Sequence, residues 1–77
     1  MNFKIGTREI IKEMEKGLIN KVVIASNAPE NIKEKINEVA NKNNVIIEID
    51  GDERQLALKV GKPFPVACVG YYKSQSK

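Results

Sequence analysis

The stretch Val22-Val23-Ile24-Ala25-Ser26-Asn27-Ala28-Pro29 decides the fold class of this chain. Its first four residues are apolar and mostly β-branched, which is typical of a central strand that is buried on both faces of a sheet. Its last four residues predict a turn that leads into a helix, because proline suits the first helical position. The stretch therefore predicts a central strand followed at once by a helix.

Strand-like and helix-like segments alternate on both sides of this stretch. Apolar residues at i, i+4, i+7 and i+8 over residues 32–40 predict a helix, and the charged residues between them, Lys35 included, are interpreted as its solvated side. Asp52 and Gln55 form a capping-box pattern that opens a short helix, and Gly61 ends it. The expected elements are strands at residues 3–5, 22–25, 45–49 and 66–72, and helices at residues 8–16, 29–42 and 52–60.

This order, β-α-β-α-β-α-β, predicts an α/β fold, with a largely parallel or mixed four-stranded sheet that is sandwiched by helices. A chain of 77 residues is expected to form a single domain. No apolar run approaches the roughly 20 residues that cross a bilayer, so we expect no membrane segment. A small domain with one cysteine suits a reducing, cytoplasmic setting.

The composition argues against catalysis and metal binding. The chain has no His, which removes the commonest general base and metal ligand. Its one cysteine, Cys68, lies in an apolar run that predicts a buried and inert thiol. Gly61-Lys62-Pro63 lacks the pattern of a phosphate-binding P-loop. Glu53 forms an acidic cluster with Asp50 and Asp52, and a magnesium site there is the alternative to turn and cap chemistry, which explains Asp50 and Asp52 without a metal. We therefore expect no enzyme activity, metal or cofactor.

The segment Gly6-Thr7-Arg8-Glu9-Ile10-Ile11-Lys12 is the first candidate binding site. A strand turns into a helix here, and the start of a helix offers free backbone N–H groups that suit phosphate oxygens. Arg8 and Lys12 share one helical face, and the Glu9 carboxylate beside them is an acceptor for the amino and imino groups of bases. The net charge of +3 permits an anionic partner. A capped helix with a surface ion pair explains the same residues without a ligand.

The segment Gly61-Lys62-Pro63-Phe64-Pro65-Val66 is the second candidate site. Two prolines bracket Phe64 and stiffen the loop. An aromatic ring presented in this way stacks on an unpaired base, and Lys62 adds a positive charge next to it. The alternative is that Phe64 covers the sheet edge as part of the core.

Together these segments resemble a known family. The chain is similar to the kink-turn RNA-binding ribosomal proteins of the large subunit, the L7Ae/L30e group, over about residues 3–72. The resemblance rests on Gly6-Thr7-Arg8-Glu9 with Lys12, on Lys21–Ala25 followed by Asn27-Ala28-Pro29, and on Gly61-Lys62-Pro63-Phe64-Pro65-Val66-Ala67. The last run looks most like the L30e branch.

The resemblance implies a three-layer α/β/α sandwich with a mixed four-stranded sheet, which binds a sharply bent RNA internal loop. By this comparison, the turn at residues 6–9 meets the sheared G·A pairs at the bend, and the loop at residues 62–66 packs against an extruded nucleotide. The residues expected to bind RNA are Gly6, Thr7, Arg8, Glu9, Lys12, Arg54, Lys62, Pro63, Phe64 and Val66. Many family members have Asn at the position of Arg8.

The leading hypothesis is a single RNA-binding domain of the kink-turn type over residues 1–77, without catalytic activity. Its expected partners are ribosomal RNA and other ribosomal proteins. Family members usually begin with a further helix before the first strand, and this chain is expected to lack it. The alternative hypothesis is a shortened paralogue that uses a bare sheet face or edge as a protein-interaction module.

Overall fold

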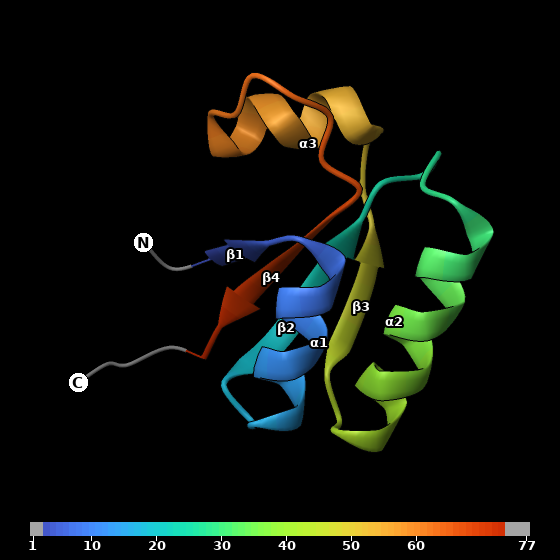
Figure 1. Cartoon of the computed structure of the whole chain (residues 1–77), viewed down its shortest axis with the longest axis vertical. Helices are drawn as coiled ribbons and strands as arrows, with labels where there is room; N and C mark the ends of the chain where they lie inside the picture. The colour runs from blue at the N-terminus through green and yellow to red at the C-terminus, as the bar shows by residue number, and fades with distance from the viewer. Residues whose placement is uncertain (1–2, 74–77) are drawn as a thin grey trace.

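The computed structural model describes residues 3–73 as a small α/β domain of seven elements (Figure 1). The ends of the predicted domain, residues 1–2 and 74–77, lie outside the described residues. In chain order the elements are β1 (Phe3–Ile5), α1 (Thr7–Glu15), β2 (Ile19–Ile24), α2 (Glu30–Lys42), β3 (Ile46–Ile49), α3 (Glu53–Val60) and β4 (Cys68–Tyr72). The predicted order β-α-β-α-β-α-β is confirmed.

The four strands form one mixed sheet in the order β1-β4-β2-β3. Strand β2 is parallel to β3 and antiparallel to β4, and β4 is also antiparallel to β1. Strands β1, β2 and β3 therefore run in one direction, and β4 runs against them. The predicted mixed four-stranded sheet is confirmed.

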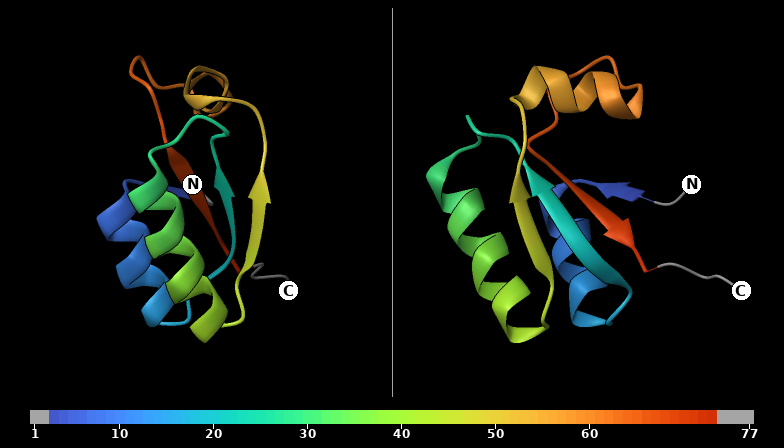
Figure 2. Two further views of the ribbon diagram at one scale, coloured as in Figure 1. Left: turned by 90° about the vertical axis from the view of Figure 1, so that its right-hand side faces the viewer. Right: turned by 180° about the vertical axis from the view of Figure 1, so that it is seen from behind.

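Helices α1 and α2 lie side by side on one face of this sheet (Figures 1 and 2). Each connects two strands that run in the same direction, and both connections step across the sheet toward β3. Because such crossovers are almost always right-handed, two steps in the same direction bring both helices to the same face. Both helices therefore begin at the end of the sheet where β1, β2 and β3 have their C-termini.

Helix α3 lies across that same end of the sheet (Figure 2). The predicted capping box is confirmed: Asp52 accepts a hydrogen bond from the Gln55 backbone at 2.9 Å, and the Gln55 side chain accepts one from the Asp52 backbone at 3.1 Å. Gly61 closes the helix in the left-handed conformation, with φ of +69° and ψ of 36°. A residue with a β-carbon rarely adopts this conformation, which explains the glycine.

The core lies between the sheet and the helices. Residues Val22, Ile24 and Ala25 are fully buried and Val23 is 6% exposed, so the predicted central strand is confirmed. The other buried residues come from the three helices, from β2 and β4, and from the loops before α2, β3 and β4. They are Ile10, Met14, Ile19, Ala28, Ile36, Ala40, Val45, Leu56, Ala57, Val66, Cys68 and Val69.

Several predicted boundaries differ from the structure for local reasons. Pro29 precedes α2 as its N-cap, because its ψ of 145° is extended, whereas the sequence predicted it inside the helix. Strand β4 starts at Cys68 and not at residue 66, since the Val66 N–H donates to the Glu53 carbonyl at 3.1 Å and not to a neighbouring strand. Strand β2 starts three residues before the predicted start, at Ile19.

Replacing the cap of α3 tests how much this helix depends on it. We expect Asp52→Ala to lower the free energy of unfolding by about 0.5–2 kcal/mol, because the Gln55 N–H loses its acceptor. Asp52→Asn is the matched control, since asparagine caps helices as well as aspartate does. Urea denaturation of the three proteins measures the effect, and equal stability of the two variants would contradict the capping role.

Candidate nucleic-acid interface

The turn at Gly6 exposes the first residues of α1. Gly6 has φ of +99°, a backbone conformation that favours glycine, and its carbonyl accepts the Ile10 N–H at 2.9 Å. Among residues 3–73, no side chain caps the N-terminus of α1 by a hydrogen bond. Arg8, Glu9 and Lys12 are all exposed to solvent. The first turn of α1 therefore presents free backbone N–H groups next to two cations and a carboxylate.

The loop at residues 62–67 is held in place by backbone hydrogen bonds at both ends. The Lys62 N–H donates to the Ala57 carbonyl at 2.9 Å, and the Ala67 carbonyl accepts the Ala25 N–H at 2.8 Å. Between them, the Val66 N–H is bonded to the start of α3. Phe64 stands between two prolines and is 50% exposed. The loop therefore presents an aromatic ring from a fixed backbone.

These two segments line one apolar slot of about 190 Å³. Thr7 and Cys68, 61 residues apart in the sequence, both line it, and Thr7 Oγ1 lies 3.6 Å from Cys68 Sγ. Burial raises the pKa of the Cys68 thiol, and the Thr7 contact opposes that shift weakly, so the thiol stays neutral at pH 7. The slot is lined by Ile5, Gly6, Thr7, Phe64, Pro65, Val66, Ala67 and Cys68.

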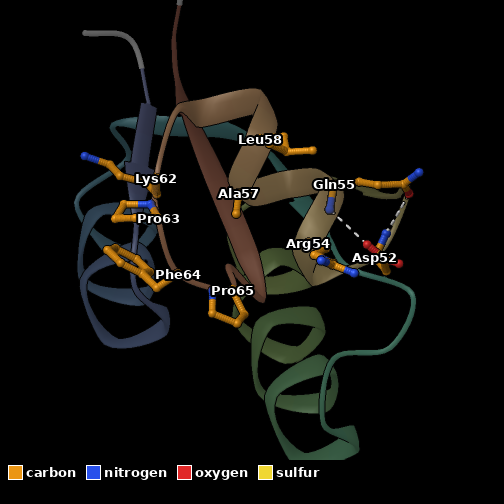
Figure 3. A pocket seen from close by; sticks show the side chains of 9 residues that line it. All are labelled: Asp52, Arg54, Gln55, Ala57, Leu58, Lys62, Pro63, Phe64 and Pro65. Carbon is orange, nitrogen blue, oxygen red and sulfur yellow. Dashed lines mark hydrogen bonds between the residues drawn. The ribbon is translucent and has the colours of Figure 1, made fainter.

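A wider depression of about 630 Å³ lies on the other side of the loop, between Phe64 and α3 (Figure 3). Arg54 and Lys62 lie on opposite sides of it, and Phe64 and Pro65 separate it from the slot. The residues that line it are Asp52, Arg54, Gln55, Ala57, Leu58, Lys62, Pro63, Phe64 and Pro65. The capping box shapes one wall of this depression.

A third hollow, the α1–α2 groove, runs between α1 and α2 and has a volume of about 370 Å³. Its lining residues are Thr7, Arg8, Ile11, Lys12, Asn31, Ile32 and Lys35. Thr7 lines both this groove and the slot. The groove, the slot and the depression therefore form one continuous surface at a single end of the molecule.

The cations of this surface are free of carboxylate partners within the described residues. The two ion pairs found over residues 3–73 lie elsewhere, between Lys21 and Glu48 at 3.4 Å and between Lys59 and Asp50 at 2.6 Å. The surface ion pair offered as an alternative for the start of α1 is thus not formed in residues 3–73. In the same residues, no cluster of three His, Cys, Asp or Glu side chains is arranged to hold a metal ion.

Nine of the ten expected site residues line this surface. Gly6, Thr7 and Val66 line the slot, although Val66 is 4% exposed and shows little of its side chain. Arg8 and Lys12 line the groove. Arg54, Lys62, Pro63 and Phe64 line the depression. Glu9 is the exception, since it is exposed beside these hollows and lines none of them.

Helix α2 also lines this surface, which the sequence did not predict. Asn31 and Lys35 line the α1–α2 groove, and both are exposed, so Lys35 lies on a solvated face as predicted. A sequence signal exists, because Lys35 comes three residues after Ile32 and so shares its side of the helix. Pro65, Ala67 and Cys68 were also not expected as lining residues of the slot.

Comparisons with known proteins identify the family. The sequence profile described as the ribosomal protein L7Ae/L30e/S12e/Gadd45 family matches residues 1–77. The large ribosomal subunit protein eL30 of Archaeoglobus fulgidus is 33% identical over 67 residues, which are 87% of this chain and 74% of that protein. The eL30 protein of Methanosarcina mazei is 35% identical over 65 residues, which are 84% of this chain and 60% of that protein.

Solved structures share the fold at lower sequence identity. A protein of unknown function from Bacillus halodurans superposes with a TM-score of 0.89 at 18% identity, over 95% of this chain and 73% of that one. The Giardia lamblia 15.5kD RNA-binding protein superposes with a TM-score of 0.88 at 21% identity, over 96% and 62%. These structures show the fold, and the sequence matches show that the chain belongs to the ribosomal protein L7Ae/L30e/S12e/Gadd45 family, close to its L30e branch.

Proposed function

We propose that this protein binds RNA without catalysing a reaction, and that it recognises a kink-turn or a similar bent internal loop as a ribosomal or ribosome-associated component. Its partners in the cytoplasm are then ribosomal RNA and neighbouring ribosomal proteins. The observation that carries the proposal is the meeting of two distant segments in one slot, which joins Gly6 and Thr7 to Phe64 and Pro65.

The chemistry of the surface suits a bent RNA. Exposed cations at Arg8, Lys12 and Arg54, and the half-buried Lys62, suit phosphates on both sides of a bend. Phosphate contacts supply most of the affinity for RNA. The exposed face of Phe64 suits stacking on a base that has left the helix. The carboxylate of Glu9 suits base amino and imino groups, which gives selectivity. The names of the eL30 relatives support a ribosomal role.

A second function class has one observation in its favour. The sheet face opposite α1 carries the cross-strand row Phe3–Tyr71–Lys21–Ile46, in which Ile46 is 61% exposed. A protein partner is the alternative occupant of that face. Within this row, Lys21 already has partners on the protein. Its Nζ forms an ion pair with Glu48 and lies 5.9 Å from the centre of the Tyr71 ring. Protein binding that depends on Ile46, in a chain without RNA affinity, would favour this alternative.

Glu9 tests the source of RNA selectivity. We expect Glu9→Ala to remove the preference for a kink-turn RNA over the same duplex with its G·A pairs replaced, at a loss of about 1–3 kcal/mol. Glu15→Ala, an exposed carboxylate at the far end of α1, is the matched control and should bind as the wild type does. Titration of both RNAs measures the effect, and unchanged selectivity in Glu9→Ala would refute the assignment.

Lys12 and Lys62 test the phosphate contacts. Each substitution by alanine should weaken binding to any RNA and lower the slope of log affinity against log salt by about one unit. Lys16→Ala removes an equal charge from the C-terminal end of α1 and should leave the slope unchanged. Titrations at several salt concentrations measure the slopes, and identical slopes in all four proteins would exclude these lysines from the interface.

Phe64 separates an interface role from a core role. Because half of this side chain is exposed (50%), we expect Phe64→Ala to destabilise the fold by less than the roughly 3–5 kcal/mol of a buried phenylalanine. RNA binding should fall by about 1–3 kcal/mol, because a stacking surface is lost. Phe64→Leu, the control, keeps apolar bulk and should melt like the wild type but bind RNA weakly. A large fall in melting temperature with RNA affinity intact would favour the core role.

A further inference from the structure

The α1–α2 groove is lined by three cations, and contacts to the RNA internal loop at residues 6–9 and 62–66 do not explain all of them. We propose that it holds backbone phosphates of the RNA stem that continues from the bound internal loop, and that Lys35 of α2 is a phosphate-binding residue. The inference rests on the proposed function and extends it, since it assigns a stem contact and a second helix to the interface.

The placement of Lys35 follows from the parallel course of the two helices. Both begin at the same end of the sheet and run side by side on one face (Figure 1). Lys12 is the sixth residue of α1 (Thr7–Glu15), and Lys35 is the sixth residue of α2 (Glu30–Lys42). The two lysines therefore lie at about the same depth below this end and line the same groove.

The charge of the groove matches a phosphate chain. Its lining includes the cations Arg8, Lys12 and Lys35 and includes no carboxylate. None of the three is in an ion pair within residues 3–73. Lys33, on the same helix, differs, because its Nζ donates to the Ser26 carbonyl at 3.0 Å. The groove thus brings together three cations that are available for an external anion.

The floor of the groove explains how these cations are held. Ile11 and Ile32 are half-buried between the helices, and the stems of long basic side chains pack on such surfaces while their charged heads stay in water. An apolar helix seated here would remove three cations from water without a partner, which is costly. A polyanion is the occupant that pairs with the three cations and leaves the stems of their side chains packed on Ile11 and Ile32.

The groove also continues the surface proposed for the internal loop. Thr7 lines the groove and the slot, so an RNA strand that leaves the slot enters the groove directly. Arg8 and Lys12, four residues apart on α1, are separated by about 6 Å along the helix. The strand would therefore pass Arg8 first and then run between Lys12 and Lys35.

The test measures RNA binding by the full chain and by two single variants. Lys35→Ala removes the proposed contact, and Lys42→Ala removes the same charge from the far end of α2. The RNAs share one kink-turn loop and differ in the length of each flanking stem, and a control duplex has the same long stems with the G·A pairs of the loop replaced. We expect Lys35→Ala to bind the long-stem RNA several-fold more weakly, with a salt slope about 0.9 lower, and Lys42→Ala to match the wild type. Shortening one of the two stems should abolish the difference between Lys35→Ala and the wild type.

Two outcomes would overturn the inference alone. In the first, the wild type prefers the loop RNA, but Lys35→Ala binds the long-stem RNA with unchanged affinity and slope. In the second, Lys35→Ala loses affinity with an unchanged slope, which would indicate a structural effect without a phosphate contact. A wild type without preference for the loop RNA would contradict the proposed function itself, and this inference with it.

Discussion

The shared direction of β1, β2 and β3 is the constraint on which the rest of this structure depends. Both connections between these strands step the same way across the sheet, so their handedness brings α1 and α2 to one face with their N-termini at one end. Strand β4 runs the opposite way and therefore begins at that same end. The loop before β4 is thus carried next to the start of α1. Ligands of α/β proteins commonly bind at this edge of the sheet.

Local signals predicted most of the fold. The apolar, β-branched run at Val22–Ala25 predicted a buried strand because such residues pack on both faces of a sheet. Asp52 and Gln55 predicted the start of α3 because a capping box is formed within four residues. The start of β2 was missed because Asn20 and Lys21 interrupt the apolar pattern. The cross-strand partners that accommodate Lys21, namely Glu48 and Tyr71, are known only from the folded sheet.

The sequence could mark candidate site residues where a single segment carries them, but not the groove that two helices make together. Gly6 and the prolines around Phe64 mark special backbone, and such positions are visible in the sequence. The exposure of Phe64 could not be derived from its neighbours, since it depends on how the loop is bonded to α3 and β2. Lys35 looks like any charged residue on a helix surface. Its place in the groove appears once α1 and α2 are packed side by side.

The central claim is that the RNA meets one end of the sheet, and not the sheet face opposite α1. Backbone amide chemical shifts of the labelled protein, recorded with and without a kink-turn RNA, test this claim most directly. The account predicts large changes at residues 6–12, at the start of α2 and over residues 62–67, with little change at the C-terminal ends of α1 and α2. Changes confined to the cross-strand row Phe3–Tyr71–Lys21–Ile46, on the sheet face opposite α1, would contradict it.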